Sequence, residues 1–185
     1  MVGSKIGMTQ EASVIRNTGG DAEIRFVNKY TVECKGADGT IKWTEDFENL
    51  VTNEGLNSNL SVYFAGGTPI TTWYMGLKNT GAPSAADTMA SHASWVENQN
   101  YSQATRPTIQ LGAVSGQAVG NSGNAASFGI NTNSQTIAGI FVASNNTKGG
   151  TAGVLYAVGD FASARSVDDG DTLNVTVTFN AASGA

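Results

Sequence analysis

The 185-residue sequence predicts an all-β protein: an antiparallel β-sandwich or jelly-roll-like domain with one short helix and an extended N-terminal arm. Several short segments alternate apolar and polar residues, which is the period of a half-buried strand. Gly, Asn and Asp turn residues separate these segments, as in sandwiches and barrels. Helical spacing is confined to one window. With no internal repeat and no linker, we expect a 1–20 arm followed by a single β-rich domain over 21–185.

The N-terminal arm mixes small polar residues with isolated apolar ones and ends in Thr18-Gly19-Gly20. Such a segment cannot build a core of its own, so we expect it to be mobile in the free protein. Its larger apolar side chains are predicted to dock on a neighbouring subunit, with the backbone adding a strand to an exposed sheet edge. These side chains are Ile6, Met8, Val14 and Ile15.

The first predicted element is a β-hairpin. Residues 23–34 carry apolar side chains mostly at even positions and polar ones at odd positions. Asp38-Gly39 is a tight-turn dipeptide. After it, Ile41 and Trp43 alternate with polar neighbours, which predicts the second strand.

The helix prediction spans residues 53–64, with Asn53 as the capping residue. Its apolar residues recur three or four positions apart and are Leu56, Leu60 and Tyr63 or Phe64. Gly55 weakens the pattern, and Gly66-Gly67 with Pro69 ends it.

The remainder predicts further strands joined by loops. Residues 79–100 form a long loop, and 168–171 form an acidic turn. The predicted strands are 71–77, 108–111, 125–130, 136–143, 154–158 and 172–179. Because residues 136–143 are nearly all apolar, we expect that strand to be central.

Charge is scarce and uneven along the chain. Residues 79–147 contain three charged side chains, whereas the first fifty residues contain fourteen. A folded region with so few charges favours packing against other subunits. The ten Lys and Arg residues do not cluster and the net charge is −5, so the pattern predicts neither nucleic-acid nor membrane-surface binding.

No constellation of residues predicts catalysis, a cofactor or a metal site. His92 is the one histidine, and we expect it to hydrogen-bond within the 79–100 loop or at a contact. The acids of the 168–171 turn do not have the spacing of an EF-hand. Cys34, the one cysteine, is predicted to lie in the core, and residues 1–10 lack a secretory signal.

Arg106 is a lone cation in uncharged surroundings. We expect it to pair with Asp87 or Glu97, within the fold or across a subunit contact.

Three stretches resemble small virion proteins of tailed bacteriophages, and the similarity extends over about 22–180. They are residues 42–57, residues 71–77 continuing to 85–95 and 101–107, and residues 137–144 with 148–150. The run Ala86-Asp87-Thr88-Met89-Ala90-Ser91-His92-Ala93-Ser94-Trp95 carries it most specifically. Some proteins of this kind look like capsid decoration, or cement, proteins.

The resemblance implies a non-enzymatic protein, made in the host cytoplasm, that lies on the outer surface of the capsid and bridges subunits of the major capsid protein. Self-association is expected from the low charge and the aromatic residues, as a homodimer rather than a trimer. The residues predicted to contact the capsid or another subunit are Ile6, Met8, Val14, Ile15, His92, Trp95 and Arg106.

Two other functions fit the same sequence. One is a tail or fibre component with a host-glycan-binding β-sandwich. The other is a carbohydrate-binding or hydrolytic enzyme on a jelly-roll scaffold, since tryptophan and tyrosine rings stack on sugars.

Overall fold

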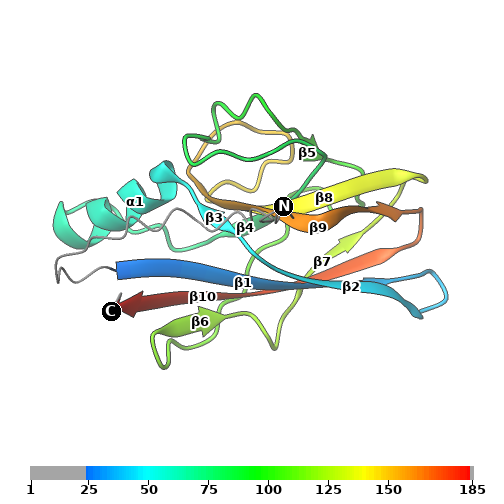
Figure 1. The fold of residues 1–185 in the computed structure, drawn as a ribbon, viewed down its shortest axis with the longest axis horizontal. Coiled ribbons are helices and arrows are strands. Elements are labelled where there is room, and N and C mark those ends of the chain that lie inside the picture. The colour runs from blue at the N-terminus through cyan, green and yellow to red at the C-terminus, as the bar shows by residue number, and fades with distance from the viewer. Residues whose placement is uncertain (1–23, 184–185) are drawn as a thin grey trace, which may run out of the picture.

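Two antiparallel β-sheets pack face to face in the computed structural model, which describes residues 24–183 (Figure 1). One sheet has the order β2-β1-β10-β6, with β7 also paired to β10, and the other has the order β3-β9-β8-β4-β5. The elements are β1 Ile24–Lys35, β2 Ile41–Glu48, β3 Leu50–Val51, α1 Asn53–Phe64, β4 Tyr74–Lys78, β5 Glu97–Asn98, β6 Ala118–Gly120, β7 Ala126–Gly129, β8 Gln135–Ala143, β9 Leu155–Val167 and β10 Thr172–Ser183. The predicted all-β sandwich is confirmed, whereas the predicted arm lies outside the described residues.

The strands pair in a nested order. The first strand pairs with the last, β1 with β10, and the pairs β3 with β9 and β4 with β8 follow inside it. This is a long hairpin wrapped around itself, which is the jelly-roll-like feature of the fold. The chain changes sheets at Asn49, the one residue between β2 and β3. Asn49 Nδ2 donates to Tyr30 Oη at 2.7 Å and so holds the crossing in place.

The main core lies between the two sheets. Leu173, Val175 and Val177 of β10 are buried, and the Thr and Asn residues between them are not. In β1, Tyr30, Val32 and Cys34 point into the same core. Period-two alternation therefore buries one face of each strand, as the sequence predicts.

A second, smaller core covers the outer face of the other sheet. Loops from residues 79–107 and 144–154 lie over β8 and β9 (Figure 1). They enclose a cluster made of Met89, Trp95, Phe141, Ala143, Leu155 and Val158. Because β8 is covered on both faces, its residues 137–143 are all buried, which explains the continuous apolar run and the central position.

Several elements differ from their predictions. Residues 108–111 form a single bridge between Thr108 and Tyr74 rather than a strand. β9 extends to Val167, beyond the predicted end at residue 158. The prediction stopped early because the second half of the strand is largely exposed and polar and shows no apolar run. The strands β3, β5 and β6 are only two or three residues long, too short to show a period.

The predicted helix has the observed bounds, but its cap differs. Thr52 rather than Asn53 is the N-cap, and its Oγ1 accepts a hydrogen bond from Gly55 N at 3.0 Å. A Thr side chain at the N-cap satisfies one of the free N–H groups of the first turn.

Candidate binding site

Arg106 and Glu97 form a buried bidentate ion pair. Arg106 Nε donates to Glu97 Oε1 at 3.0 Å, and Nη2 donates to Glu97 Oε2 at 2.7 Å. The guanidinium also donates to the carbonyls of Asn145 and Gly150, at 2.9 and 2.8 Å. The pair therefore joins β5 to the 144–150 turn, and the partner of Arg106 lies within the fold.

Asp87 has a different structural role. Its Oδ2 accepts hydrogen bonds from Trp95 Nε1 at 2.8 Å and from the backbone N of Ser84 at 2.9 Å. His92 stacks on Trp95 with ring centroids 4.1 Å apart, and its Nδ1 lies 3.0 Å from the Trp95 carbonyl oxygen. The residue run that carries the phage resemblance is thus a loop that contributes Met89 and Trp95 to the second core, and Met89 N also donates to Glu54 Oε2 of α1 at 3.2 Å.

These placements change the set of predicted contact residues. The side chains of Trp95 and Arg106 are 2% and 1% exposed, so neither offers surface to a partner, and both belong to the internal structure. His92 is half-buried and keeps part of its surface. The other four predicted contact residues, Ile6, Met8, Val14 and Ile15, lie outside the described residues.

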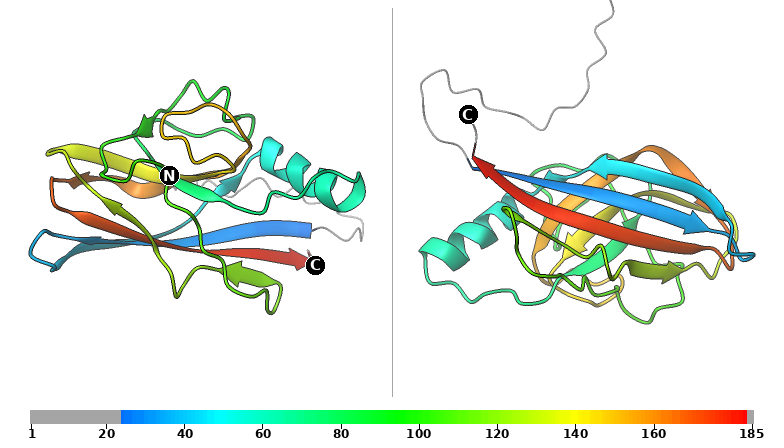
Figure 2. Two further views of the ribbon diagram at one scale, coloured as in Figure 1. Left: turned by 180° about the vertical axis from the view of Figure 1, so that it is seen from behind. Right: turned by 90° about the horizontal axis from the view of Figure 1, so that it is seen from below.

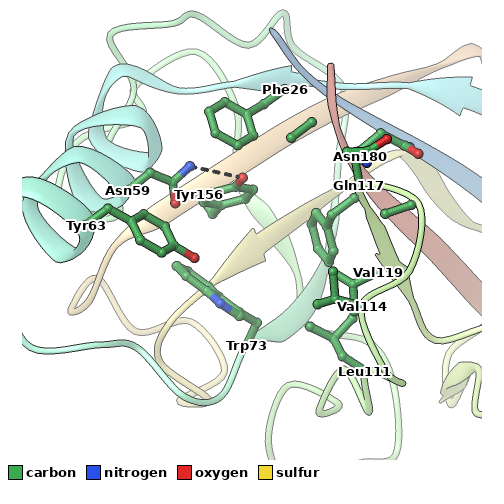
Figure 3. Close-up of a pocket in the computed structure, with 13 residues that line it drawn as sticks. Phe26, Asn59, Tyr63, Trp73, Leu111, Val114, Gln117, Val119, Tyr156 and Asn180 are labelled. Carbon is green, nitrogen blue, oxygen red and sulfur yellow. Dashed lines mark hydrogen bonds between the residues drawn. The ribbon is translucent and has the colours of Figure 1, made fainter. Parts of the chain in front are cut away.

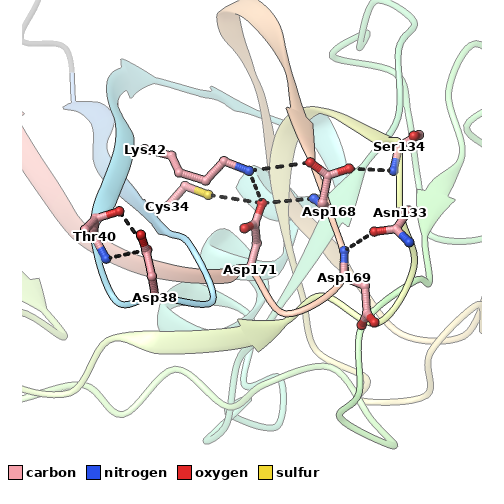
Figure 4. A network of polar contacts seen from close by, with 9 residues as sticks. All are labelled: Cys34, Asp38, Thr40, Lys42, Asn133, Ser134, Asp168, Asp169 and Asp171. Atoms are coloured by element: carbon pink, nitrogen blue, oxygen red, sulfur yellow. Dashed lines mark hydrogen bonds and ion pairs between the residues drawn. The ribbon is translucent and has the colours of Figure 1, made fainter.

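The acidic 168–171 turn is held by Lys42 (Figure 4). Lys42 Nζ lies 2.7 Å from Asp171 Oδ2 and 3.6 Å from Asp168 Oδ2. The hydrogen bond to Asp171 raises the pKa of the Lys42 ammonium. Within residues 24–183, no group of three or more His, Cys, Asp or Glu side chains is placed to hold a metal ion. The contacts of Lys42 with Asp168 and Asp171 link the start of β2 to the β9–β10 turn.

Cys34 lies beside this network and should be inert toward thiol reagents in the folded protein. Its side chain is fully buried. Burial is the main cause that raises the pKa of the thiol to about 11, and the negative charge of the nearby Asp171 carboxylate adds to it. The reactive thiolate is then on the order of one thiol in a thousand at pH 8. Because the unfolded chain ionises this thiol at lower pH, stability should also fall as the pH rises from about 9 toward 11.

A thiol-reagent assay at pH 8 tests this directly. We expect almost no reaction in the native protein and one thiol per chain after addition of denaturant. Fast native reaction would contradict the burial of Cys34.

An apolar groove opens at the end of the sandwich where β1 begins and β10 ends. Its volume is about 380 Å³. Figure 3 shows Tyr63 and Trp73 on one side and Leu111, Val114 and Val119 on the other. The described lining residues are Phe26, Asn59, Tyr63, Trp73, Leu111, Val114, Gln117, Ala118, Val119, Tyr156, Phe179, Asn180 and Ala181, and none has a charged side chain.

One wall of the groove is a row of packed aromatic rings. Tyr156 lies 5.1 Å from Trp73 and 5.7 Å from Phe179 between ring centroids. Two of the three amides that line the groove, those of Asn59 and Asn180, already have partners within the chain. Asn59 Nδ2 donates to Tyr156 Oη at 3.4 Å, and Asn180 Nδ2 donates to the carbonyls of Val27 and Thr178 at 3.1 Å each. The groove therefore suits an apolar ligand.

The helix α1 extends this apolar surface. Its predicted apolar stripe exists, but it faces solvent instead of the core: Leu56, Leu60, Tyr63 and Phe64 are all exposed, the last two at 78% and 81%. Gly55 is the one buried residue of the helix. We call the groove and this stripe together the apolar end surface, since Tyr63 belongs to both.

The sequence analysis did not identify the groove. Its lining comes from β1, α1, the 73–74 entry into β4, the 111–119 segment, β9 and β10. The helix carried one signal for an apolar surface at this end. Its polar positions are Asn and Ser with a single acid, Glu54, so the helix has few charged side chains to mark which face is exposed to water.

No protein-family model, curated protein or solved structure matches this chain. The described part of the chain has no helix that is both long and apolar enough to cross a membrane. The apolar end surface is therefore the candidate functional site on geometric grounds alone.

Proposed function

We propose that this protein is a structural component of a tailed-phage virion that decorates the capsid and cements it by bridging neighbouring subunits of the major capsid protein. The observation that carries the proposal is the apolar end surface, an uncharged surface on a domain whose buried charged side chains are ion-paired or, for Asp87, hydrogen-bonded within the chain. The resemblance of residues 22–180 to small phage virion proteins supports the same role. The proposed function is non-enzymatic.

Contact through this surface supplies enough free energy for decoration. Burying one large apolar side chain contributes about 1.5–3 kcal/mol. Leu60, Tyr63 and Phe64 are exposed together, so one contact can bury all three. Many copies on a regular shell would then share the load of a pressurised head.

The edge of the first sheet that is formed by β2 is unsuited to association. β2 is an edge strand, and Asp46 and Glu48 are exposed along it. Charged side chains on an edge strand discourage pairing with another sheet. Contacts are therefore expected at the apolar end surface, with the capsid and, in a homodimer, with a second copy.

Particle binding tests the proposal. Added to purified heads that lack it, the full chain should bind in hundreds of copies per particle, as counted by quantitative gel or mass spectrometry. Leu60→Ser with Phe64→Ser should lower the bound copy number at least tenfold, because the apolar contact is lost. A deletion of residues 1–20 should also weaken attachment.

The matched control is Ile41→Ser with Val96→Ser, which removes two exposed apolar side chains away from the end surface. Equal binding by the control and the helix variant would contradict the proposal. A count of a few to tens of copies in the complete purified virion would place the protein in the tail instead.

A tail or fibre component that binds a host glycan is the second candidate. The observation in its favour is that Trp73 and Tyr63 line the groove close to the amides of Asn59 and Gln117 (Figure 3). Aromatic rings with amide neighbours are a common sugar-binding arrangement. Glycan-array binding that is lost in Trp73→Ala would favour this candidate.

A further inference from the structure

The groove is an uncovered end of the main hydrophobic core. Trp73 and Phe179 pack against the core cluster, and Tyr156 is part of it. The same three rings line the groove. At the other end of the sandwich, short turns connect β1 to β2 and β9 to β10 (Figure 2). An apolar surface left open in this way is typical of a binding site for another apolar segment.

The chain itself contains a segment of the right character next to this opening. Twenty-three residues precede Ile24, the first residue of β1, and Phe26 two positions later lines the groove. Beyond Met1 and Val2, the larger apolar side chains of those twenty-three residues occur as Ile6 and Met8 and as Val14 and Ile15. Positions 6 and 8 fall on one side of an extended backbone, so both can enter a groove together.

We infer that the groove binds residues 6–15 of the N-terminal segment of a second copy of this chain. The inference builds on the proposed decoration role, because such links would join neighbouring copies across the shell.

Two observations favour a second copy over the same chain. Residues 16–23 form a polar spacer that contains Arg16, Asp21 and Glu23 and suits solvent better than an apolar wall. Eight extended residues span roughly 26–29 Å, which is enough to reach a neighbouring subunit.

Reciprocal exchange also gives a closed assembly. If each copy donates its segment and receives the other, the contact is two-fold and produces the homodimer expected from the sequence. Free copies at low concentration would lack this contact, whereas copies crowded on a capsid would gain it by proximity.

The lining favours aliphatic side chains over a saccharide. The side facing the aromatic rings consists of Leu111, Val114 and Val119. A sugar needs several free hydrogen-bond partners, and of the three lining amides those of Asn59 and Asn180 are already engaged, which leaves only Gln117. Segment 6–15 has one charged residue, Glu11, and so needs little polar compensation.

Disulfide trapping between full-length chains tests this inference. One chain carries Val14→Cys alone and the other carries Val114→Cys alone, and the two are mixed and oxidised. Native Cys34 is fully buried and should not take part. We expect a disulfide-linked dimer on a non-reducing gel, in at least fivefold higher yield than with Val96→Cys as the matched control. Val96 and Val114 are both exposed valines, and only Val114 lines the groove.

Three outcomes would overturn the inference. A link that forms only when one chain carries both Val14→Cys and Val114→Cys would make the chain's own segment the occupant. A yield no higher than the Val96→Cys control would show that the segment does not bind the groove, and a fluorescence response of Trp73 to oligosaccharides instead of a peptide of residues 1–20 would make a saccharide the occupant.

Sedimentation gives an independent readout on intact chains. The wild type should dimerise as concentration rises, and Val114→Asp should weaken dimerisation at least tenfold, while Val96→Asp should leave it unchanged. Equal dimerisation by both variants would overturn the inference. These measurements use free protein, so their failure would leave binding to capsid subunits as a separate question, which the particle assay answers.

Discussion

Replacing Arg106 by Met is expected to lower the free energy of unfolding by about 3–5 kcal/mol. The substitution leaves the Glu97 carboxylate, 5% exposed, without its cation. Glu97 Oε2 would keep the hydrogen bond from Gly149 N at 2.7 Å, which stabilises the charge only in part. The carbonyls of Asn145 and Gly150 would lose their guanidinium donors as well. Urea unfolding followed by fluorescence measures the loss as a fall in midpoint at constant m-value.

The double variant Arg106→Met with Glu97→Leu separates the pair's own contribution from the cost of an orphaned charge. Apolar residues of similar size can replace a buried pair with little loss. We therefore expect the double variant to be more stable than Arg106→Met alone. Lys29→Ala is the surface control, because Lys29 and Glu48 form an exposed pair at 3.8 Å that is worth about 0–1 kcal/mol. A loss as small as that of Lys29→Ala would mean that the Arg106 pair does not hold the loops.

Gly55→Ala is expected to destabilise the protein by about 1–3 kcal/mol, the range of an overpacked site. In an isolated helix the same change stabilises by about 1 kcal/mol, so the two effects have opposite signs. A Cβ at position 55 would lie 2.3 Å from the backbone oxygen of Tyr156, much closer than atoms pack. The helix would have to move away from β9.

Moving the helix disturbs the bonds at its first turn. Thr52 N donates to the Tyr156 carbonyl at 3.1 Å, and Glu54 Oε2 accepts from Leu155 N at 2.7 Å. Because Asn59 and Tyr63 line the groove, the shift should also weaken particle binding. Asn57→Ala is the matched control, since Asn57 is exposed on the same helix and the change adds helix propensity without a clash. Equal or greater stability of Gly55→Ala would show that the helix is not seated on β9 as described.

The sequence by itself determined the parts of this protein that depend on local pattern. The alternation in residues 23–34 and 172–179 predicts β1 and β10 because side chains on a strand point to opposite faces at every step. The bounds of α1 follow from spacing and from the Gly-rich segment after it. The expectation that Arg106 has an acidic partner follows from the high cost of leaving a charge unpaired in uncharged surroundings.

The tertiary structure alone decided which surfaces are covered. The stripe of Leu56, Leu60 and Phe64 has the spacing of a core-facing helix, yet only Gly55 of α1 is buried. Spacing shows that apolar residues share a face, but contact with another element determines whether that face is buried. In the same way, Glu97 rather than Asp87 pairs with Arg106 because the loops bring it within 2.7 Å, while Asp87 bonds to Trp95. The groove combines residues from Phe26 to Ala181, far apart in the chain, and exists only because the two sheets and α1 meet at one end.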